Sequence, residues 1–426
     1  MLAVQIISKE TIKPSSPTPQ NLHSLPLSLL DQIAPQIYSH ILLFYSKNPP
    51  QTLIQLKSSL SKTLTHFYPL GGRIKASKDD NTLYVECNDD GVEFIHAQTN
   101  AELDSVLLQP PIDQFNELLP IKASNFRYGD PLLAVQLTWF KPHGFVLGFS
   151  ISHLIADGAS MAMFLNRWAD VARGLELHPA PRFDSMAAFP PRPQFTTNQA
   201  PKQESGQPAA IIKRFVMSPR AIARLRGGGG YDNGRVHAPT RIEALSALVL
   251  RCLVRARGEA ARGKRAVAAH SVNLRRRLSP PLSDESFGNL WISVAAVGKL
   301  VGDGCDDGSG QGVLEEALRN GVREVDEEYV RRKAEERWLG RDGMDGVVEG
   351  DSEVWIFSSW CRMPWYKTDF GWGEPEWVGC GISDMKDVCI LIDTKDGDGM
   401  EVWLWLRAEE MERVERDPEF LDFISS

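Results

Sequence analysis

Residues 144–158 read Gly-Phe-Val-Leu-Gly-Phe-Ser-Ile-Ser-His-Leu-Ile-Ala-Asp-Gly, an apolar run that ends in titratable side chains. The pattern predicts a buried strand that stops at His153, followed by Asp157 and a helix that runs through Trp168. Polar groups at the end of a core strand are typical of sites held on a rigid scaffold. Histidine titrates near neutral pH, as a general base should. These residues alone leave two interpretations open: a catalytic base, or a hydrogen-bonded core histidine beside an aspartate that pairs with a distant arginine.

The composition is that of a soluble globular protein. The chain has 426 residues, 42% hydrophobic and 24% charged, which predicts two or three domains and excludes disordered and fibrous classes. Its net charge of -8 argues against nucleic acid or an anionic membrane as the main partner. The longest apolar run, 145–156, is shorter than the roughly 20 residues that a membrane span needs. The six cysteines are scattered without a CxxC pair, which favours reduced thiols in the cytoplasm.

Strand and helix patterns alternate along the chain, which predicts a mixed α/β fold. Between residues 178 and 208 the composition changes to Pro, Gln, Ser and Asn, as in a linker. We therefore expect an N-terminal domain over 1–190, a crossover linker over 191–210 and a C-terminal domain over 211–426. A capping box at Thr240 and Glu243 predicts the start of a helix in the second domain.

Charge is segregated in the second half of the chain. Residues 213–277 hold 16 basic and 3 acidic side chains, whereas residues 303–353 hold 16 acidic and 7 basic ones. The basic residues over 255–265 allow two interpretations, a solvated loop after the helix or a wall that binds an anion.

Several common chemistries lack their motifs. The sequence has no Gly-x-Ser-x-Gly elbow, no HExxH and no Gly-x-Gly-x-x-Gly between a strand and a helix. The nearest approach to a phosphate loop, 258–264, is followed by Arg265 instead of the Ser or Thr that binds magnesium. We therefore expect no metal site and no nucleotide site. The aromatic stretch 355–373 reads, without a family, as part of the core.

Two motifs and their order identify a family. Residues 153–158 read HLIADG, which fits HxxxDG, and residues 369–373 read DFGWG. With YPLGGR at 68–73, VNLR at 272–275 and FGN at 287–289, the whole chain resembles the BAHD family of plant acyl-CoA-dependent acyltransferases. The resemblance implies two chloramphenicol-acetyltransferase-like α/β domains, each a mixed sheet flanked by helices, joined by a crossover loop with a channel between them. In the family the segment after DFGWG packs with the first domain, as we expect here from about residue 374.

The resemblance also implies a mechanism. His153 would remove the proton of an alcohol as the alcohol attacks an acyl-CoA thioester in a ternary complex, without an acyl-enzyme. Ser358 and Trp360 would donate hydrogen bonds to the oxyanion, although Trp360 has core packing as an alternative role. Asp157 would pair with Arg275 instead of joining a triad, because a buried carboxylate needs such a partner. Structural roles are expected for Asp157, Gly158, Arg275, Asp369, Phe370, Gly371, Trp372 and Gly373.

The ligands follow from the same resemblance. We expect no bound cofactor, acyl-CoA as co-substrate, and Asn273, Ser246 and Ser359 as candidates for CoA binding. Residues 357–362 and DFGWG are similar to the acetylating branch, with its vinorine synthase-like enzymes that act on alkaloid and terpenoid alcohols. Acetyl-CoA and such an alcohol are therefore the predicted substrates, and a cytoplasmic monomer is the predicted state. The alternatives are a malonyl-, benzoyl-, hydroxycinnamoyl- or fatty-acyl-CoA donor, an amine acceptor, or a silent scaffold, which the intact His153 disfavours.

Overall fold

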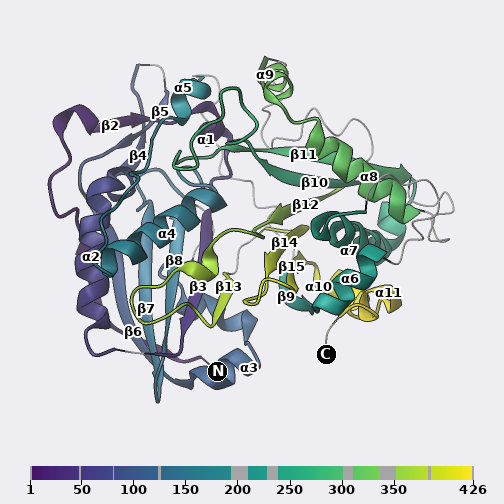
Figure 1. Cartoon of the computed structure of the whole chain (residues 1–426), viewed down its shortest axis with the longest axis horizontal. Helices are drawn as coiled ribbons and strands as arrows, with labels where there is room; N and C mark the ends of the chain where they lie inside the picture. Colours follow the sequence, from purple (N-terminus) through teal and green to yellow (C-terminus); the bar gives the residue numbers. More distant parts are fainter. Residues whose placement is uncertain are drawn as a thin grey trace. The chain divides into compact units, whose positions relative to one another are not determined.

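The computed structural model describes residues 2–47, 49–79, 81–122, 126–192, 210–227, 238–300, 310–335, 352–381 and 385–424. Most of the predicted linker, 193–209, lies outside these residues. The chain divides into two compact units, each of which contains a large β-sheet and helices (Figure 1). Unit 1 comprises Met1–Ser205, Ser283–Leu290 and Met363–Ser383, and unit 2 comprises Gly206–Leu282, Trp291–Arg362 and Asp384–Ser426.

The main sheet of unit 1 has six strands in its described part, and β8 lies inside it between β7 and β3. Only β6 and β7 pair in parallel; the other neighbours are antiparallel. In spatial order the strands are β1 (Val4–Ile12), β6 (Val92–Glu102), β7 (Leu133–Lys141), β8 (Phe145–Ser152), β3 (Tyr38–Tyr45) and β13 (Trp377–Cys380). A smaller sheet contains β2 (Ser24–Pro26), β5 (Leu83–Glu86) and β4 (Arg73–Ala76).

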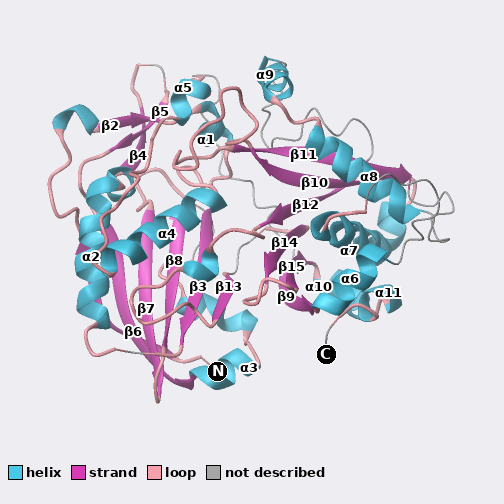
Figure 2. Cartoon of the chain, in the orientation of Figure 1, coloured by secondary structure: helices cyan, strands magenta, loops and turns pink. Residues whose placement is uncertain are grey.

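Two long helices pack against each other beside this sheet (Figure 2). They are α2 (Thr52–His66) and α4 (Gly158–Ala172). Trp168 of α4 donates from its indole nitrogen to Ser59 of α2 over 2.9 Å, and its ring meets that of Phe149 edge-on at 5.8 Å. The shorter helices of unit 1 are α1 (Leu29–Ile33), α3 (Leu103–Leu108), α5 (Ser185–Ala188) and the 3₁₀ segment η3 (Ile112–Leu118).

Strand β8 is buried along its whole length, as its apolar run predicts. At Gly148 a Cβ atom would lie 2.1 Å from the carbonyl oxygen of Leu118, so only glycine permits this close approach of two backbones. The strand is thus packed tightly enough to hold the residue that follows it, His153, in a fixed place.

Unit 2 also has a six-stranded mixed sheet in its described part. In spatial order its strands are β11 (Trp291–Leu300), β10 (Arg265–Asn273), β12 (Ser352–Ser359), β14 (Val388–Asp393), β15 (Met400–Leu406) and β9 (Ile211–Met217). Its helices are α6 (Pro219–Gly227), α7 (Arg241–Arg257), α8 (Gly310–Arg323), α9 (Glu327–Glu335), α10 (Ala408–Glu415) and α11 (Pro418–Leu421). The predicted capping box of α7 is present, with the Thr240 hydroxyl and the Glu243 carboxylate each accepting a backbone N–H. The predicted α/β fold, with two sheet-containing domains flanked by helices, is confirmed.

Two segments from the second half of the sequence belong to unit 1. The expected C-terminal domain, 211–426, includes both Ser283–Leu290 and Met363–Ser383, which the structure places in unit 1. The first is held by backbone hydrogen bonds between Arg182 and residues 285 and 287, and the second adds β13 to the edge of the sheet beside β3. Long-range backbone pairing of this kind leaves no local pattern in the sequence.

No helix in the described part of the chain combines the length and the apolar character that a bilayer crossing requires.

Candidate active site

The end of β8 and the start of α4 position His153 and Asp157. The His153 backbone N–H donates to the carbonyl oxygen of Ile37 over 2.9 Å. This hydrogen bond holds His153 against the segment that directly precedes β3. Four residues later Asp157 is the N-cap of α4, and its carboxylate accepts the backbone N–H of Ser160 over 2.8 Å. The His-to-Asp spacing of the motif is therefore the length of the turn between a strand end and a helix cap.

Asp157 also binds a segment from far along the chain. Its second carboxylate oxygen accepts the backbone N–H of Leu290 over 3.0 Å, and the Asp157 side chain is 6% exposed. These contacts of the Asp157 carboxylate stabilise one helix start and one backbone segment, which agrees with a structural role. The predicted ion pair with Arg275 joins residues of different units and stays a prediction.

The segment 288–290 is held against the start of α4 from both sides. The Ser160 hydroxyl donates to the carbonyl oxygen of Gly288 over 2.9 Å and accepts its N–H over 3.0 Å. Gly288 has φ of +139°, a conformation that favours glycine, and a Cβ there would lie 3.1 Å from the Ser185 hydroxyl. The adjacent Glu285 pairs with Arg167 of α4 at 3.0 Å. These contacts fix the position of Asn289.

Asn289 contacts His153 directly. Its side-chain oxygen lies 3.1 Å from Nδ1 of His153, and its amide nitrogen donates to the His153 carbonyl oxygen over 2.7 Å. The same nitrogen and the Asn289 backbone N–H both donate to one carboxylate oxygen of Asp31, over 3.0 and 2.7 Å. Asp31 is the third residue of α1 and closes a capping box with Ser28. Asn289 is therefore held directly by the start of α1, while the start of α4 holds the residues on either side of it. Its side chain contacts His153.

Burial lowers the pKa of His153 below its ordinary value of 6.5, because desolvation disfavours the imidazolium. The nearby Asp157 carboxylate and the hydrogen bond with Asn289 act in the opposite direction and offset part of this effect. The ring is consequently neutral at pH 7, the state in which a histidine can accept a proton. Burial also raises the pKa of the fully enclosed Asp31.

The DFGWG motif lies at the other end of α4. The ring of Phe370 meets that of Trp168 at 5.0 Å, and Gly371 sits beside Gln55 and Arg173. One carboxylate oxygen of Asp369 accepts the N–H groups of residues 371 and 373, both over 2.8 Å. Since α4 is 15 residues long, roughly 22 Å of helix separates this motif from the N-cap beside His153. The motif thus packs against α2 and the C-terminal part of α4, far from His153.

The remaining predicted residues belong to unit 2. Ser358 and Ser359 end β12, and the backbone N–H of Trp360 donates to the Leu391 carbonyl oxygen over 2.8 Å. Ser246 is fully buried in α7. Asn273 ends β10, and its side-chain oxygen accepts hydrogen bonds from the backbone N–H and the guanidinium of the buried Arg275. Their roles toward the oxyanion and CoA stay predictions.

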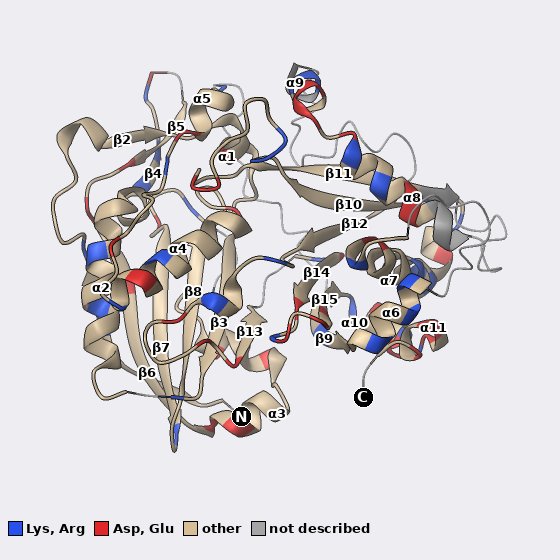
Figure 3. Cartoon of the chain, in the orientation of Figure 1, with Lys and Arg blue, Asp and Glu red and all other residues tan. Residues whose placement is uncertain are grey.

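The basic residues over 255–265, at and after the end of α7, differ in their surroundings (Figure 3): Arg262 and Arg265 are exposed, as a solvated loop predicts, whereas Arg257 is buried. Arg257 lies inside the last turn of α7, is 7% exposed, and pairs with Glu353, Asp387 and Glu410. Lys264 pairs with Glu353 at 2.7 Å. Arg257 and Lys264 are thus paired with acidic residues from distant parts of the sequence, and the solvated-loop interpretation is wrong for Arg257.

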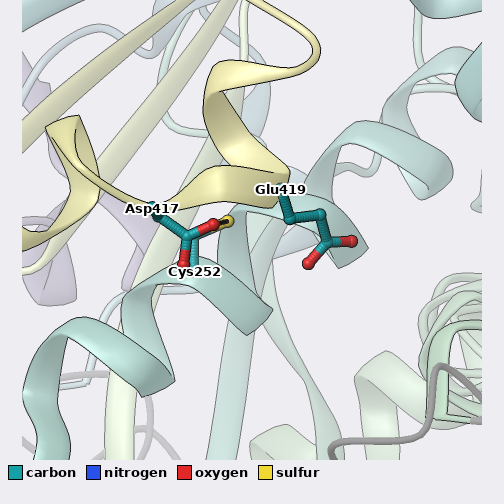
Figure 4. Close-up of side chains that lie close together, drawn as sticks. All are labelled: Cys252, Asp417 and Glu419. Atoms are coloured by element: carbon teal, nitrogen blue, oxygen red, sulfur yellow. Dashed lines mark hydrogen bonds between the residues drawn. The ribbon is translucent and has the colours of Figure 1, made fainter.

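One cluster in unit 2 has the residue types of a metal site: Cys252, Asp417 and Glu419 (Figure 4). Arg255 already binds both carboxylates, at 2.7 Å to each. Desolvation also raises the pKa of Cys252, so its sulfur stays a thiol, whereas a metal ligand must be a thiolate. The cluster is therefore an ion-pair network that joins α7 to α11.

Sequence reasoning missed three residues of the site, Asn289, Asp31 and Ser160. Asn289 stands in the stretch 287–289 that supports the family resemblance, but nothing local assigns it a role. The Ser28 to Asp31 spacing signals a helix start, which would have pointed to Asp31 as a capping residue only. The hydrogen bond between Asn289 and Asp31 joins residues that are 258 positions apart in the sequence.

Comparison with known proteins agrees with the motifs and the fold. The model of the Transferase family matches residues 2–421. A limonoid 21-O-acetyltransferase of Melia azedarach is 35% identical over 99% of this chain and 98% of its own length. Stemmadenine O-acetyltransferase of Catharanthus roseus is 33% identical over 97% of this chain and 96% of its own length. The crystal structure of vinorine synthase is similar with a TM-score of 0.82 and 30% identity, covering 99% of both chains. The chain belongs to the Transferase (BAHD) family and is an acyltransferase.

Proposed function

We propose that the enzyme transfers an acetyl group from acetyl-CoA to a hydroxyl group of a plant specialised metabolite, a terpenoid or alkaloid alcohol. The relatives above support this assignment, because they are named as O-acetyltransferases of a limonoid and of stemmadenine. The observation that carries the chemistry is the neutral His153 at the end of β8, with Nδ1 held by Asn289.

His153 acts as the general base. An alcohol of high pKa attacks a thioester well only when its proton is removed as the new bond forms. Nε2 of His153 takes this proton, the tetrahedral oxyanion collapses, and the CoA thiolate leaves. Ser152 is the last residue of β8, directly before His153, and neighbouring residues of an extended chain point to opposite faces, so a covalent serine intermediate has no support.

The accessory roles follow the family resemblance. Ser358 and Trp360 donate to the oxyanion, Asn273, Ser246 and Ser359 contact CoA, and Asp157 with Gly158 and Arg275 supports the site. The partly buried hydrogen bonds between Asn273 and Arg275 are consistent with a fixed chain segment after β10. We further propose that the enzyme is a cytoplasmic monomer, with reduced cysteines, and that residues 191–210 are the crossover linker.

A donor screen tests the proposal. Purified enzyme is incubated with acetyl-, malonyl-, benzoyl- and coumaroyl-CoA against pooled plant alcohols and amines, beside a His153→Ala variant, and products are detected by mass spectrometry. We expect an acetyl ester that the variant does not form. Product from another donor, or an amide, would replace the acetyl ester assignment. CoA binding without product would call for other acceptors, and loss of both would favour a silent scaffold.

The pH profile of kcat/KM provides a second test. The base acts only as neutral imidazole, so activity falls as the pH drops through the pKa of His153. Because burial lowers this pKa, we expect the midpoint of the acid limb below 6.5 and constant activity from there to pH 8. Initial rates at subsaturating substrate measure it. A midpoint above 6.5 would contradict a desolvated base.

A further inference from the structure

The hydrogen-bond partners of the Asn289 side chain determine which way its amide oxygen and nitrogen point. Its amide nitrogen carries two hydrogens and lies 3.0 Å from the Asp31 carboxylate and 2.7 Å from the His153 carbonyl oxygen. Both of these partners are acceptors. If the amide were turned around, its oxygen would face two acceptors, and the amide nitrogen would stand at Nδ1 of His153. The orientation with the oxygen toward Nδ1 is therefore fixed by the Asp31 carboxylate and the His153 backbone, and not by the imidazole ring.

This orientation has a consequence for the proton on the imidazole. An amide oxygen can only accept, so the ring nitrogen that faces it at 3.1 Å must be the one that carries the hydrogen. In a neutral histidine one nitrogen is protonated and the other bears a lone pair. A proton on Nδ1 leaves Nε2 as the base.

We propose that Asn289 is a positioning residue that sets the tautomer of His153, and that Asp31 acts through it by locking the Asn289 amide. This inference rests on the proposed role of His153 as general base and deepens it. It assigns to an asparagine and a helix cap the task that a carboxylate performs in serine-protease triads, where the buried acid holds the histidine in the correct tautomer.

The surroundings of Asn289 support the lock. One oxygen of Asp31 accepts both N–H groups of Asn289, and the other accepts from the backbone and hydroxyl of Ser28 over 3.0 and 2.6 Å. Asp157 and Ser160 hold the residues on either side of Asn289 from the start of α4. The starts of α1 and α4 thus fix the amide together, and the HxxxDG aspartate contributes to catalysis by holding this segment.

Nuclear magnetic resonance of the unmodified enzyme tests the tautomer directly. The protein is labelled with ¹⁵N-histidine, and the His153 signals are those that disappear in His153→Gln. We expect a protonated Nδ1 and an unprotonated Nε2 at pH 8. A proton on Nε2 would overturn the proposal, whatever the enzyme's activity.

Two substitutions at Asn289 separate positioning from packing. Asn289→Leu removes the acceptor at Nδ1 and should lower kcat by about 10²-fold, with KM for the donor changed less than about threefold. Asn289→Asp keeps an acceptor at Nδ1, but its second oxygen faces the Asp31 carboxylate and the His153 carbonyl oxygen and must therefore carry a proton, so the variant should retain more kcat than Asn289→Leu. Equal kcat losses in the two variants would contradict the proposal.

The Asp31→Asn substitution tests the lock, with Glu243→Gln as its control. Both change an acid that closes a capping box, but Glu243 lies at the start of α7 in unit 2. We expect Asp31→Asn to lower kcat about tenfold and to mix the two His153 tautomers, and Glu243→Gln to do neither. Unchanged tautomer signals in Asp31→Asn would remove Asp31 from the proposal. If His153→Ala kept full activity, the general-base assignment would fail, while the tautomer spectra would still report on Asn289.

Discussion

Replacing His153 with alanine is expected to lower kcat by about 10²–10⁴-fold, because the alcohol loses the group that removes its proton in the transition state. The substitution leaves the fold in place. The strand before it is held by packing and backbone pairing, and the His153 backbone hydrogen bond to Ile37 does not depend on the side chain. Steady-state rates at saturating donor and acceptor, with circular dichroism on the same samples, measure both effects.

The control for this experiment is His143→Ala, which removes an exposed histidine two residues before β8. We expect wild-type rates from it. If His153→Ala retained more than a few percent of wild-type kcat, the general-base assignment would have to be abandoned.

Replacing Asp157 with alanine is expected to reduce both stability and activity. The variant loses the N-cap hydrogen bond to Ser160, worth about 1 kcal/mol, and leaves the N–H of Leu290 without its charged acceptor, at about 2 kcal/mol more. We therefore expect about 3 kcal/mol less free energy of unfolding, lower yield of soluble protein, and a lower kcat because the 288–290 segment no longer holds Asn289. Thermal unfolding and rates on the same preparation measure these losses.

Thr240→Ala serves as the matched control, since it removes an exposed N-cap of α7 with no link to the site. It should cost about 1 kcal/mol of stability and leave kcat unchanged. An Asp157→Ala enzyme with wild-type stability and a defect in rate alone would contradict the structural role and restore the triad interpretation.

Local patterns were enough to predict the main elements of the site. The apolar run into His153 predicted β8, and the segment after Asp157 predicted α4, because burial and helical periodicity act over a few residues. The charge pattern was less informative. Arg257 reads as a surface residue beside other arginines, but its partners Glu353 and Glu410 come from segments about 100 and 150 positions later.

The sequence by itself determined the family, the α/β class and the histidine, because two intact motifs and their order carry this information. Only the tertiary structure decided which residues hold that histidine. Asn289 comes from a segment 136 positions after His153, and Asp31 from one 258 positions before Asn289. Hydrogen bonds of this kind form where the chain closes on itself, and neither periodicity nor capping signals reach across such distances.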